Sequence, residues 1–278
     1  MKNSAFFLLC ACFLISLHAS ATDRNFVFTY ESRTLQGGLR ELEAYVTYKN
    51  GREDFYSAVE NRLEFEIGLS QHLQTSFYLN LSAETFPVTT YTPVTDQNGE
   101  VTFTQVQDLK TNFNVGFSNE WKYQLSDPSA NKIGSALYGE ISLSPHEYEL
   151  EGKIILDKKF NHFVTALNLV GELEWETETK NENITWELDK KAELDYGLCY
   201  SVKNHFSLGF EARNENVFDT ENGWEHSALF LGPNFSYKQP DWWVAFGIQP
   251  QLTDLRTGGL DLEDHEKVDA RLLFSYSF

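Results

Sequence analysis

The chain has 278 residues, of which 41% are hydrophobic and 23% are charged, with 41 acidic residues against 22 basic ones. Its 7 prolines and 17 glycines, without any low-complexity tract, argue against collagen-like and disordered classes. The net charge of −19 argues against a nucleic-acid partner, because phosphate binding needs clustered Lys and Arg. Aromatic residues reach 15%, which leaves a folded, acidic protein with rings available for a packed or lipid-facing surface.

Residues 1–21 have the pattern of a cleaved signal peptide. Lys2 precedes an apolar run that ends at Leu17, and residues 19–21 (Ala-Ser-Ala) have the small side chains that signal peptidase requires. The run is short for a membrane-spanning helix of about 20 residues. We therefore expect residues 1–21 to be removed. The mature chain then keeps Cys199 as its single thiol, so the fold has to hold without an intramolecular disulfide.

The rest of the chain alternates apolar and polar side chains with a period of two, which is typical of β-strands. In one such run Leu63, Phe65 and Ile67 alternate with charged residues. Short and long polar connections alternate along the chain. The pattern predicts twelve strands, at residues 39–49, 55–69, 75–84, 109–123, 132–144, 148–156, 162–176, 185–200, 206–216, 227–237, 242–252 and 267–278.

The pattern does not determine the structure of two segments. Residues 22–38 form a lead-in of uncertain shape, with a short extra strand at residues 26–28 as one option. The longest connection, residues 85–108, is rich in Thr, Val and Gln. It either folds into a lumen as a constriction or forms a hairpin.

Two architectures accept many alternating strands: a soluble sandwich or barrel with apolar residues inside, and a transmembrane barrel with apolar residues toward lipid. Strands of 10 to 15 residues suit a tilted membrane span better than a soluble sheet. Aromatic residues also gather at the strand ends in two girdles. Those beside short connections are Trp121, Tyr123, Tyr200, Tyr237, Trp242 and Tyr276, and those beside long ones are Tyr48, Trp175 and Trp186. We therefore predict an all-β fold, a transmembrane antiparallel up-and-down β-barrel of twelve strands over residues 39–278.

The signal peptide, the even strand number, the alternating connections and the last strand, RLLFSYSF, together resemble Gram-negative outer-membrane β-barrel proteins of the porin or channel type. Members of that class commonly end in an aromatic residue after alternating apolar ones, which are here Phe278, Tyr276 and Phe274. The resemblance implies a place in the cell outer membrane and contact with its lipid and lipopolysaccharide. It also implies that the barrel-assembly machinery reads the terminal strand, and that the short connections are periplasmic.

The polar face of the strands would line the lumen, and acidic residues outnumber basic ones on it. One interpretation is a passive, porin-like channel whose acidic wall favours cations or small amine-bearing solutes. The alternative is a non-conducting structural or surface-interaction barrel whose ion pairs fill a narrow lumen. Both interpretations rest on the same candidate lumen-lining residues: Arg62, Glu64, Glu66, Glu172, Glu174, Asp189, Lys191, Glu193, Asp195, Arg213 and Arg271.

Catalysis and cofactor binding find little support in the sequence. Outer-membrane phospholipases, which resemble this chain in architecture, use Ser, His and Asn on the lipid-facing side, whereas here Ser207 falls on the lumen face beside His205 at a short connection. No GxGxxG, P-loop, HExxH or CxxC motif occurs. The loop segment LDLEDHE, residues 260–266, carries carboxylates of the kind that bind a hard cation, although such charge runs are usually only solvated. We expect no enzyme activity, no cofactor and no metal.

Overall fold

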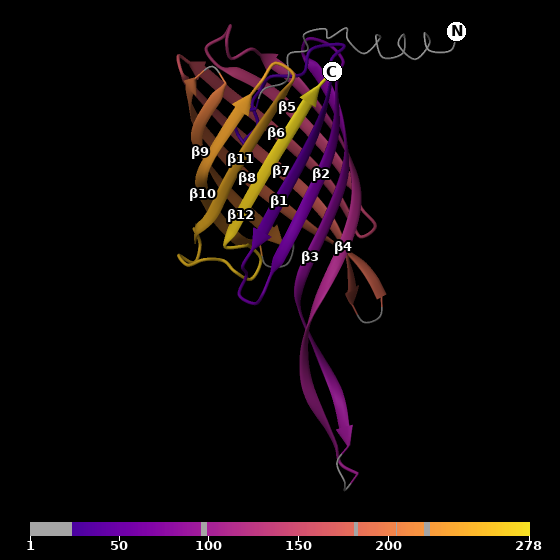
Figure 1. Ribbon diagram of the computed structural model, residues 1–278. Helices are drawn as coiled ribbons and strands as arrows, with labels where there is room; N and C mark the ends of the chain where they lie inside the picture. The colour runs from indigo at the N-terminus through magenta and orange to yellow at the C-terminus, as the bar shows by residue number, and fades with distance from the viewer. Residues whose placement is uncertain (1–23, 96–98, 181–182, 204, 220–222) are drawn as a thin grey trace, which may run out of the picture.

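The computed structural model describes residues 24–95, 99–180, 183–203, 205–219 and 223–278, which form a closed barrel (Figure 1). The expected signal peptide, residues 1–21, lies outside the described residues. The strands are β1 (Arg40–Asn50), β2 (Ser57–Gly68), β3 (Leu73–Thr95), β4 (Val101–Ser126), β5 (Gly134–Leu143), β6 (Glu147–Phe160), β7 (Phe163–Lys180), β8 (Asn183–Lys203), β9 (Phe206–Asp219), β10 (Gly223–Lys238), β11 (Trp242–Asp254) and β12 (Val268–Ser277). Among these residues, no helix has the length and apolar character needed to cross a membrane.

The topology is up-and-down and antiparallel throughout. Each strand pairs with its neighbours in sequence, and β1 also pairs with β12, from Glu41↔Ser277 to Asn50↔Val268, which closes the barrel. The predicted all-β, twelve-strand fold is therefore confirmed. Ten of the predicted strands need only small shifts of their ends, whereas β3 and β4 are much longer than expected.

The barrel turns its apolar side chains outward. In β1, Leu42 and Val46 are exposed while Glu41 and Glu43 are buried. In β12 the rings of Phe274 and Tyr276 are exposed, as is Phe278, and the serines between them are buried. A soluble protein buries apolar residues and exposes charged ones, so this inverted pattern is the one expected of a barrel whose outer wall faces lipid.

The two ends of the barrel differ. The C-terminus and the short connections, such as residues 69–72 and 239–241, lie at one end, which we call the turn end (Figure 1). The longer connections, including residues 51–56 and 255–267, lie at the opposite end, which we call the loop end.

Strands β3 and β4 continue far beyond the loop end as a two-stranded hairpin (Figure 1). Their pairing runs without a register shift from Leu73↔Tyr123 to Thr95↔Val101. The β2–β3 pairing ends at Thr85, and the β4–β5 pairing begins at Phe117. The paired part of the hairpin from Thr85 to Thr95 is therefore about 33 Å long at 3.3 Å per residue. Of the two options for residues 85–108, the structure has the hairpin, and this hairpin leads away from the lumen.

Residues 24–35 pass through the interior of the barrel instead of adding a strand. Phe26, Val27 and Phe28 are almost completely buried there. The suggested short strand at residues 26–28 is wrong, because the backbone N–H groups of Val27, Phe28 and Thr29 donate to the side chain of Glu211 in the barrel wall and not to a neighbouring strand.

Candidate functional site

A segment of the chain, residues 24–35, occupies the lumen toward the turn end, and we call it the plug segment. The carboxylate of Glu211 accepts hydrogen bonds from the backbone N–H groups of Val27, Phe28 and Thr29, at 2.7, 2.8 and 2.7 Å. The amide of Asn168 accepts from Tyr30 N at 2.6 Å and donates to Tyr30 O at 2.9 Å. A buried N–H group without an acceptor is costly. Glu211 and Asn168 therefore stabilise the plug segment in the lumen by accepting hydrogen bonds from its backbone.

The side chains of the plug segment reach opposite sides of the barrel. Phe26 packs in a cluster with Val164, Ala166 and Cys199 of β7 and β8. Val27 and Phe28 pack in another, with residues of β1, β11 and β12 that include Trp243. Tyr30 packs against Tyr138 and its neighbours on β5 and β6. The plug segment therefore spans the lumen from wall to wall.

Basic side chains of the wall stack on the rings of the plug segment. The guanidinium groups of Arg213 and Arg271 lie 4.6 and 4.3 Å from the centroid of the Phe28 ring. Lys153 lies 4.7 Å from the Tyr30 ring, and Arg24 of the plug segment lies 4.2 Å from the same ring. Cations placed over aromatic faces are attracted by the ring quadrupole, so part of the basic charge of the wall serves to hold the plug segment.

Ion pairs cross the lumen between strands that are not neighbours. Arg62 of β2 lies 2.5 Å from Glu140 of β5. Arg213 of β9 lies 2.5 Å from Asp269 of β12 and 3.0 Å from Glu215 on its own strand. Such contacts are geometrically available only inside the barrel, so these side chains lie in the lumen.

The candidate lumen-lining residues fall into separate groups. Glu64 and Glu66 lie beside Arg24 and Tyr30 of the plug segment, and Arg213 and Arg271 stack on the ring of Phe28. Asp195 is buried in β8. The remaining candidates lie nearer the loop end; these are Arg62, Glu172, Glu174, Asp189, Lys191 and Glu193. The structure thus places all eleven inside the barrel without gathering them into one site.

Carboxylates oppose one another across β6 and β7. The cross-strand partners are Glu147↔Glu176, Glu149↔Glu174 and Glu151↔Glu172. On the far side of β7, Glu174 is also opposite Asp189, whereas Glu172 is opposite Lys191. Like charges directly opposite in a sheet are destabilising. Lys191 reduces this repulsion by pairing with Glu172 at 3.1 Å and with Glu174.

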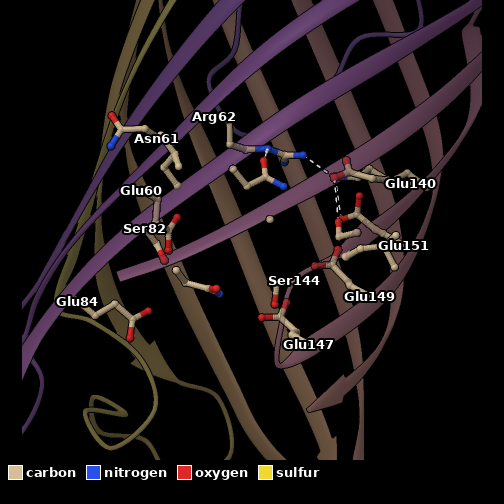
Figure 2. Close-up of a pocket in the computed structure, with 17 residues that line it drawn as sticks. Glu60, Asn61, Arg62, Ser82, Glu84, Glu140, Ser144, Glu147, Glu149 and Glu151 are labelled. Carbon is tan, nitrogen blue, oxygen red and sulfur yellow. Dashed lines mark hydrogen bonds and ion pairs between the residues drawn. The ribbon is translucent and has the colours of Figure 1, made fainter. Parts of the chain in front are cut away.

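The lumen is hollow at the loop end and nearly filled at the plug segment. One loop-end cavity of about 310 Å³ is drawn in Figure 2, where Glu147, Glu149 and Glu151 point into it. A second, of about 560 Å³, we call the vestibule; nine acidic residues line it against three basic ones, Lys49, Arg52 and Lys191. Its acidic residues are Glu172, Glu174, Glu176, Asp189, Glu193, Glu215, Glu225, Asp264 and Glu266. Beside Arg24 and Tyr30 the free volume falls to about 20 Å³.

The sequence reasoning did not single out the plug segment or the two wall residues that bind its backbone, Glu211 and Asn168. Two glycines in the inward register were a usable signal. A Cβ atom at Gly197 would lie 2.6 Å from the ring of Phe26, and one at Gly247 would lie 3.0 Å from Val27 Cγ2. Glycine within a strand often marks the close approach of another group, and here that group is the plug segment.

Solved structures with a similar fold are outer-membrane barrels. The COG4313 outer membrane channel from Pseudomonas putida F1 is 10% identical and matches with a TM-score of 0.58, covering 91% of this chain and 100% of that chain. The NanC porin is 11% identical with a TM-score of 0.49, covering 84% and 98% of the two chains. The translocator domain of the autotransporter NalP from Neisseria meningitidis is 8% identical with a TM-score of 0.47, covering 99% and 96%.

The likeness to the first of these structures shows a shared barrel fold. Comparison with curated protein sequences finds no significant match. A family model matches residues 18–278, nearly the whole chain, and the protein therefore belongs to that family, described as "Family of unknown function (DUF6662)".

Proposed function

We propose that the protein is a channel of the outer membrane whose acidic vestibule gathers cations or small amine-bearing solutes, and whose passage the plug segment closes in the conformation described. The observation that carries the proposal is the ladder of opposed carboxylates on β6 and β7, which continues into the vestibule. If the charged side chains of the lumen served only to fill it with ion pairs, each acidic side chain would have a basic partner. The excess of acids at the loop end instead favours mobile cations.

The location in the membrane rests on the outward apolar wall and on the terminal strand. With the C-terminus on the periplasmic side, the turn end is periplasmic, and the vestibule and the hairpin face outward. The barrel wall then contacts outer-membrane lipid and lipopolysaccharide. The exposed rings of Phe274, Tyr276 and Phe278 form the signal that the barrel-assembly machinery reads.

Closure rests on the volumes along the lumen. Cavities of about 310 and 560 Å³ at the loop end contrast with about 100 Å³ beside Asn25 and Glu31 and about 20 Å³ beside Arg24 and Tyr30. Solutes that enter the vestibule therefore meet the plug segment. Because Glu211 accepts three of the backbone hydrogen bonds of this segment, permeation requires these bonds to break.

Planar-bilayer recording of the refolded chain tests the proposal. We expect the wild type to show rare or small conductance steps. Glu211→Ala leaves three buried N–H groups without their acceptor, at a cost of about 1–3 kcal/mol each, and should raise the open probability at least several-fold. Glu84→Gln, at the loop end away from the plug segment, is the matched control and should behave as the wild type. The proposal fails if neither the wild type nor Glu211→Ala conducts.

The alternative is a non-conducting barrel that acts through its outward loops. Two observations favour it: the dense hydrogen bonding of the plug segment, and the long hairpin that extends away from the barrel. In that case Glu211→Ala loosens the barrel without opening a pore, which the same recording shows.

A further inference from the structure

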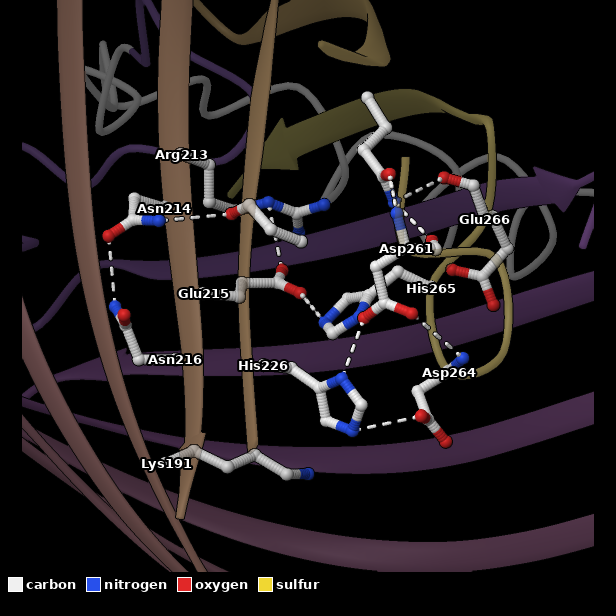
Figure 3. Close-up of polar contacts among 12 residues, drawn as sticks. Lys191, Arg213, Asn214, Glu215, Asn216, His226, Asp261, Asp264, His265 and Glu266 are labelled. Carbon is white, nitrogen blue, oxygen red and sulfur yellow. Dashed lines mark hydrogen bonds and ion pairs between the residues drawn. The ribbon is translucent and has the colours of Figure 1, made fainter. Parts of the chain in front are cut away.

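Two histidines and two aspartates meet at the loop end, beside the vestibule. His226 lies near the start of β10, while Asp261, Asp264 and His265 belong to the connection between β11 and β12 (Figure 3). Nδ1 of His226 lies 2.9 Å from Asp261 Oδ2, and its Nε2 lies 2.9 Å from Asp264 Oδ2. Nδ1 of His265 lies 2.8 Å from the same Asp261 oxygen. The two elements therefore converge on one small volume.

The contacts of His226 cannot all be hydrogen bonds of a neutral ring. A neutral imidazole carries one N–H donor and one acceptor nitrogen, yet both nitrogens of His226 face carboxylate oxygens. In the neutral ring one of these contacts sets a nitrogen lone pair against a carboxylate, whereas the protonated ring donates to both carboxylates. A divalent cation bound at one of these nitrogens removes the repulsion of the neutral ring, because it accepts the lone pair and attracts the carboxylates.

The geometry suits a small metal ion. The ligand atoms of His226, Asp261 and Asp264 all lie within 4.8 Å of one another. Zinc bonds to histidine nitrogen and carboxylate oxygen are about 2.0–2.2 Å long, which in a tetrahedron separates the ligands by about 3.4 Å. Asp261 and Asp264 face different nitrogens of the ring, so one of the two carboxylates has to rotate toward the nitrogen that binds the ion. The side chain of Asp264 is 55% exposed and that of Asp261 only 9%, so solvent reaches one side of the cluster and a water molecule can complete the coordination.

The backbone around the cluster is already fixed. The side-chain amide of Gln251 exchanges two hydrogen bonds with the backbone of Asp261, each of 2.7 Å. Asp254 accepts from the backbone N of Ser227, next to His226, at 2.8 Å. His265 Nδ1 contacts Asp261 and its Nε2 lies 3.3 Å from Glu215. Residues that orient a ligand in this way raise metal affinity substantially.

We propose that His226, Asp261 and Asp264 form a binding site for a divalent transition-metal ion of the zinc class. Imidazole nitrogen with carboxylate oxygen is a ligand set for such ions, whereas calcium takes six to eight oxygen ligands. The bound ion ties the β11–β12 connection to β10 and so fixes the rim of the vestibule. This inference does not depend on whether the barrel conducts.

Titration of the refolded, chelator-treated barrel with Zn²⁺ in detergent, followed by calorimetry, tests the site. We expect one equivalent to bind, with an affinity that falls at least about tenfold in His226→Ala. His146→Ala removes another loop-end histidine, in the β5–β6 connection, and should leave the affinity unchanged. Co²⁺ in place of Zn²⁺ should give visible absorption bands in the wild type that are lost in His226→Ala, which a merely structural role of His226 would not cause.

Three outcomes would contradict the site: no saturable Zn²⁺ binding, equal affinity in the wild type and His226→Ala, or tighter binding of Ca²⁺ than of Zn²⁺. Asp264→Asn covers the case in which His226→Ala does not refold, because it changes only an exposed carboxylate. Its affinity for Zn²⁺ should also fall about tenfold, while the barrel keeps its heat-resistant migration on gels. None of these measurements involves ion conduction, so they stand apart from the test of the channel.

Discussion

The ring of Phe26 fits against β8 because residue 197 has no side chain. A Cβ atom added at Gly197 would come within 2.6 Å of that ring, closer than van der Waals contact allows. On the same wall Cys199 is buried in the cluster that Phe26 completes. This thiol, the single one in the chain after residue 21, is therefore a natural reporter of whether the plug segment is seated.

Gly197→Ala should displace Phe26 and loosen the plug segment. Overpacking of this kind costs about 1–3 kcal/mol, which lowers the urea midpoint of unfolding and increases the rate at which a maleimide labels Cys199. Gly171→Ala on β7 is the control, since a Cβ atom there meets no described heavy atom within 4 Å, and it should leave both quantities unchanged. Equal labelling rates in the two variants would show that Gly197 does not hold the plug segment.

At the scale of elements, the β3–β4 hairpin is held together by hydrogen bonds between its own two strands. Beyond Thr85 its strands pair with each other, and an isolated two-stranded hairpin is only marginally stable in water. Exposed apolar side chains along it include Tyr91, Phe103 and Leu109. Its folding is therefore separable from that of the barrel wall.

Replacing residues 88–108 with a two-residue turn should leave the barrel intact. The wall pairings of β3 with β2 and of β4 with β5 lie outside the deleted part, so we expect the same heat-resistant migration on gels and the same urea midpoint as in the full chain. Limited proteolysis of the full chain should cut within this segment first. A lower urea midpoint after the deletion would mean that the hairpin stabilises the wall.

Strand positions were accessible from the sequence because a wall between lipid and lumen imposes a period of two on every strand, as at Leu63, Phe65 and Ile67. For residues 85–108 the sequence left a hairpin as one of two options, because Pro87, Pro93 and the run of Thr and Val are also compatible with a loop once that constraint ends. The plug segment was missed. Its three apolar residues, 26–28, are too few to show a period. The wall residues that bind its backbone, Glu211 and Asn168, cannot be distinguished in the sequence from other polar residues of the inner face.

At the scale of the whole molecule, we expect the uneven distribution of charge along the lumen to determine which ions the channel prefers. The vestibule has nine acidic residues against three basic ones, and low-dielectric walls concentrate the resulting field. Toward the plug segment the bases are engaged by Phe28, Tyr30 and nearby carboxylates. Selectivity should therefore arise at the loop end, before a solute reaches the closure.

Cation selectivity should weaken as salt rises, because the screening length falls from about 10 Å at 0.1 M to about 3 Å at 1 M. Reversal potentials of Glu211→Ala in a salt gradient measure this directly. Adding Glu174→Lys, in the vestibule, should reduce the preference, whereas Glu53→Lys makes the same charge change on the exposed β1–β2 connection and should have little effect. Anion preference in dilute salt at neutral pH would rule out the acidic vestibule as a filter.

Closure of the barrel between β1 and β12 also governs how the protein folds. Glu41 pairs with Ser277, so the contact that closes the barrel joins residues 236 positions apart (277 − 41), and the plug segment lies shortly before β1 in the chain. Contacts so distant in sequence carry a large loop-closure entropy and make folding slow. The nascent barrel must stay open until its C-terminal strand is complete, and during that interval the plug segment offers the inner face of β1, β11 and β12 an apolar surface to fold around.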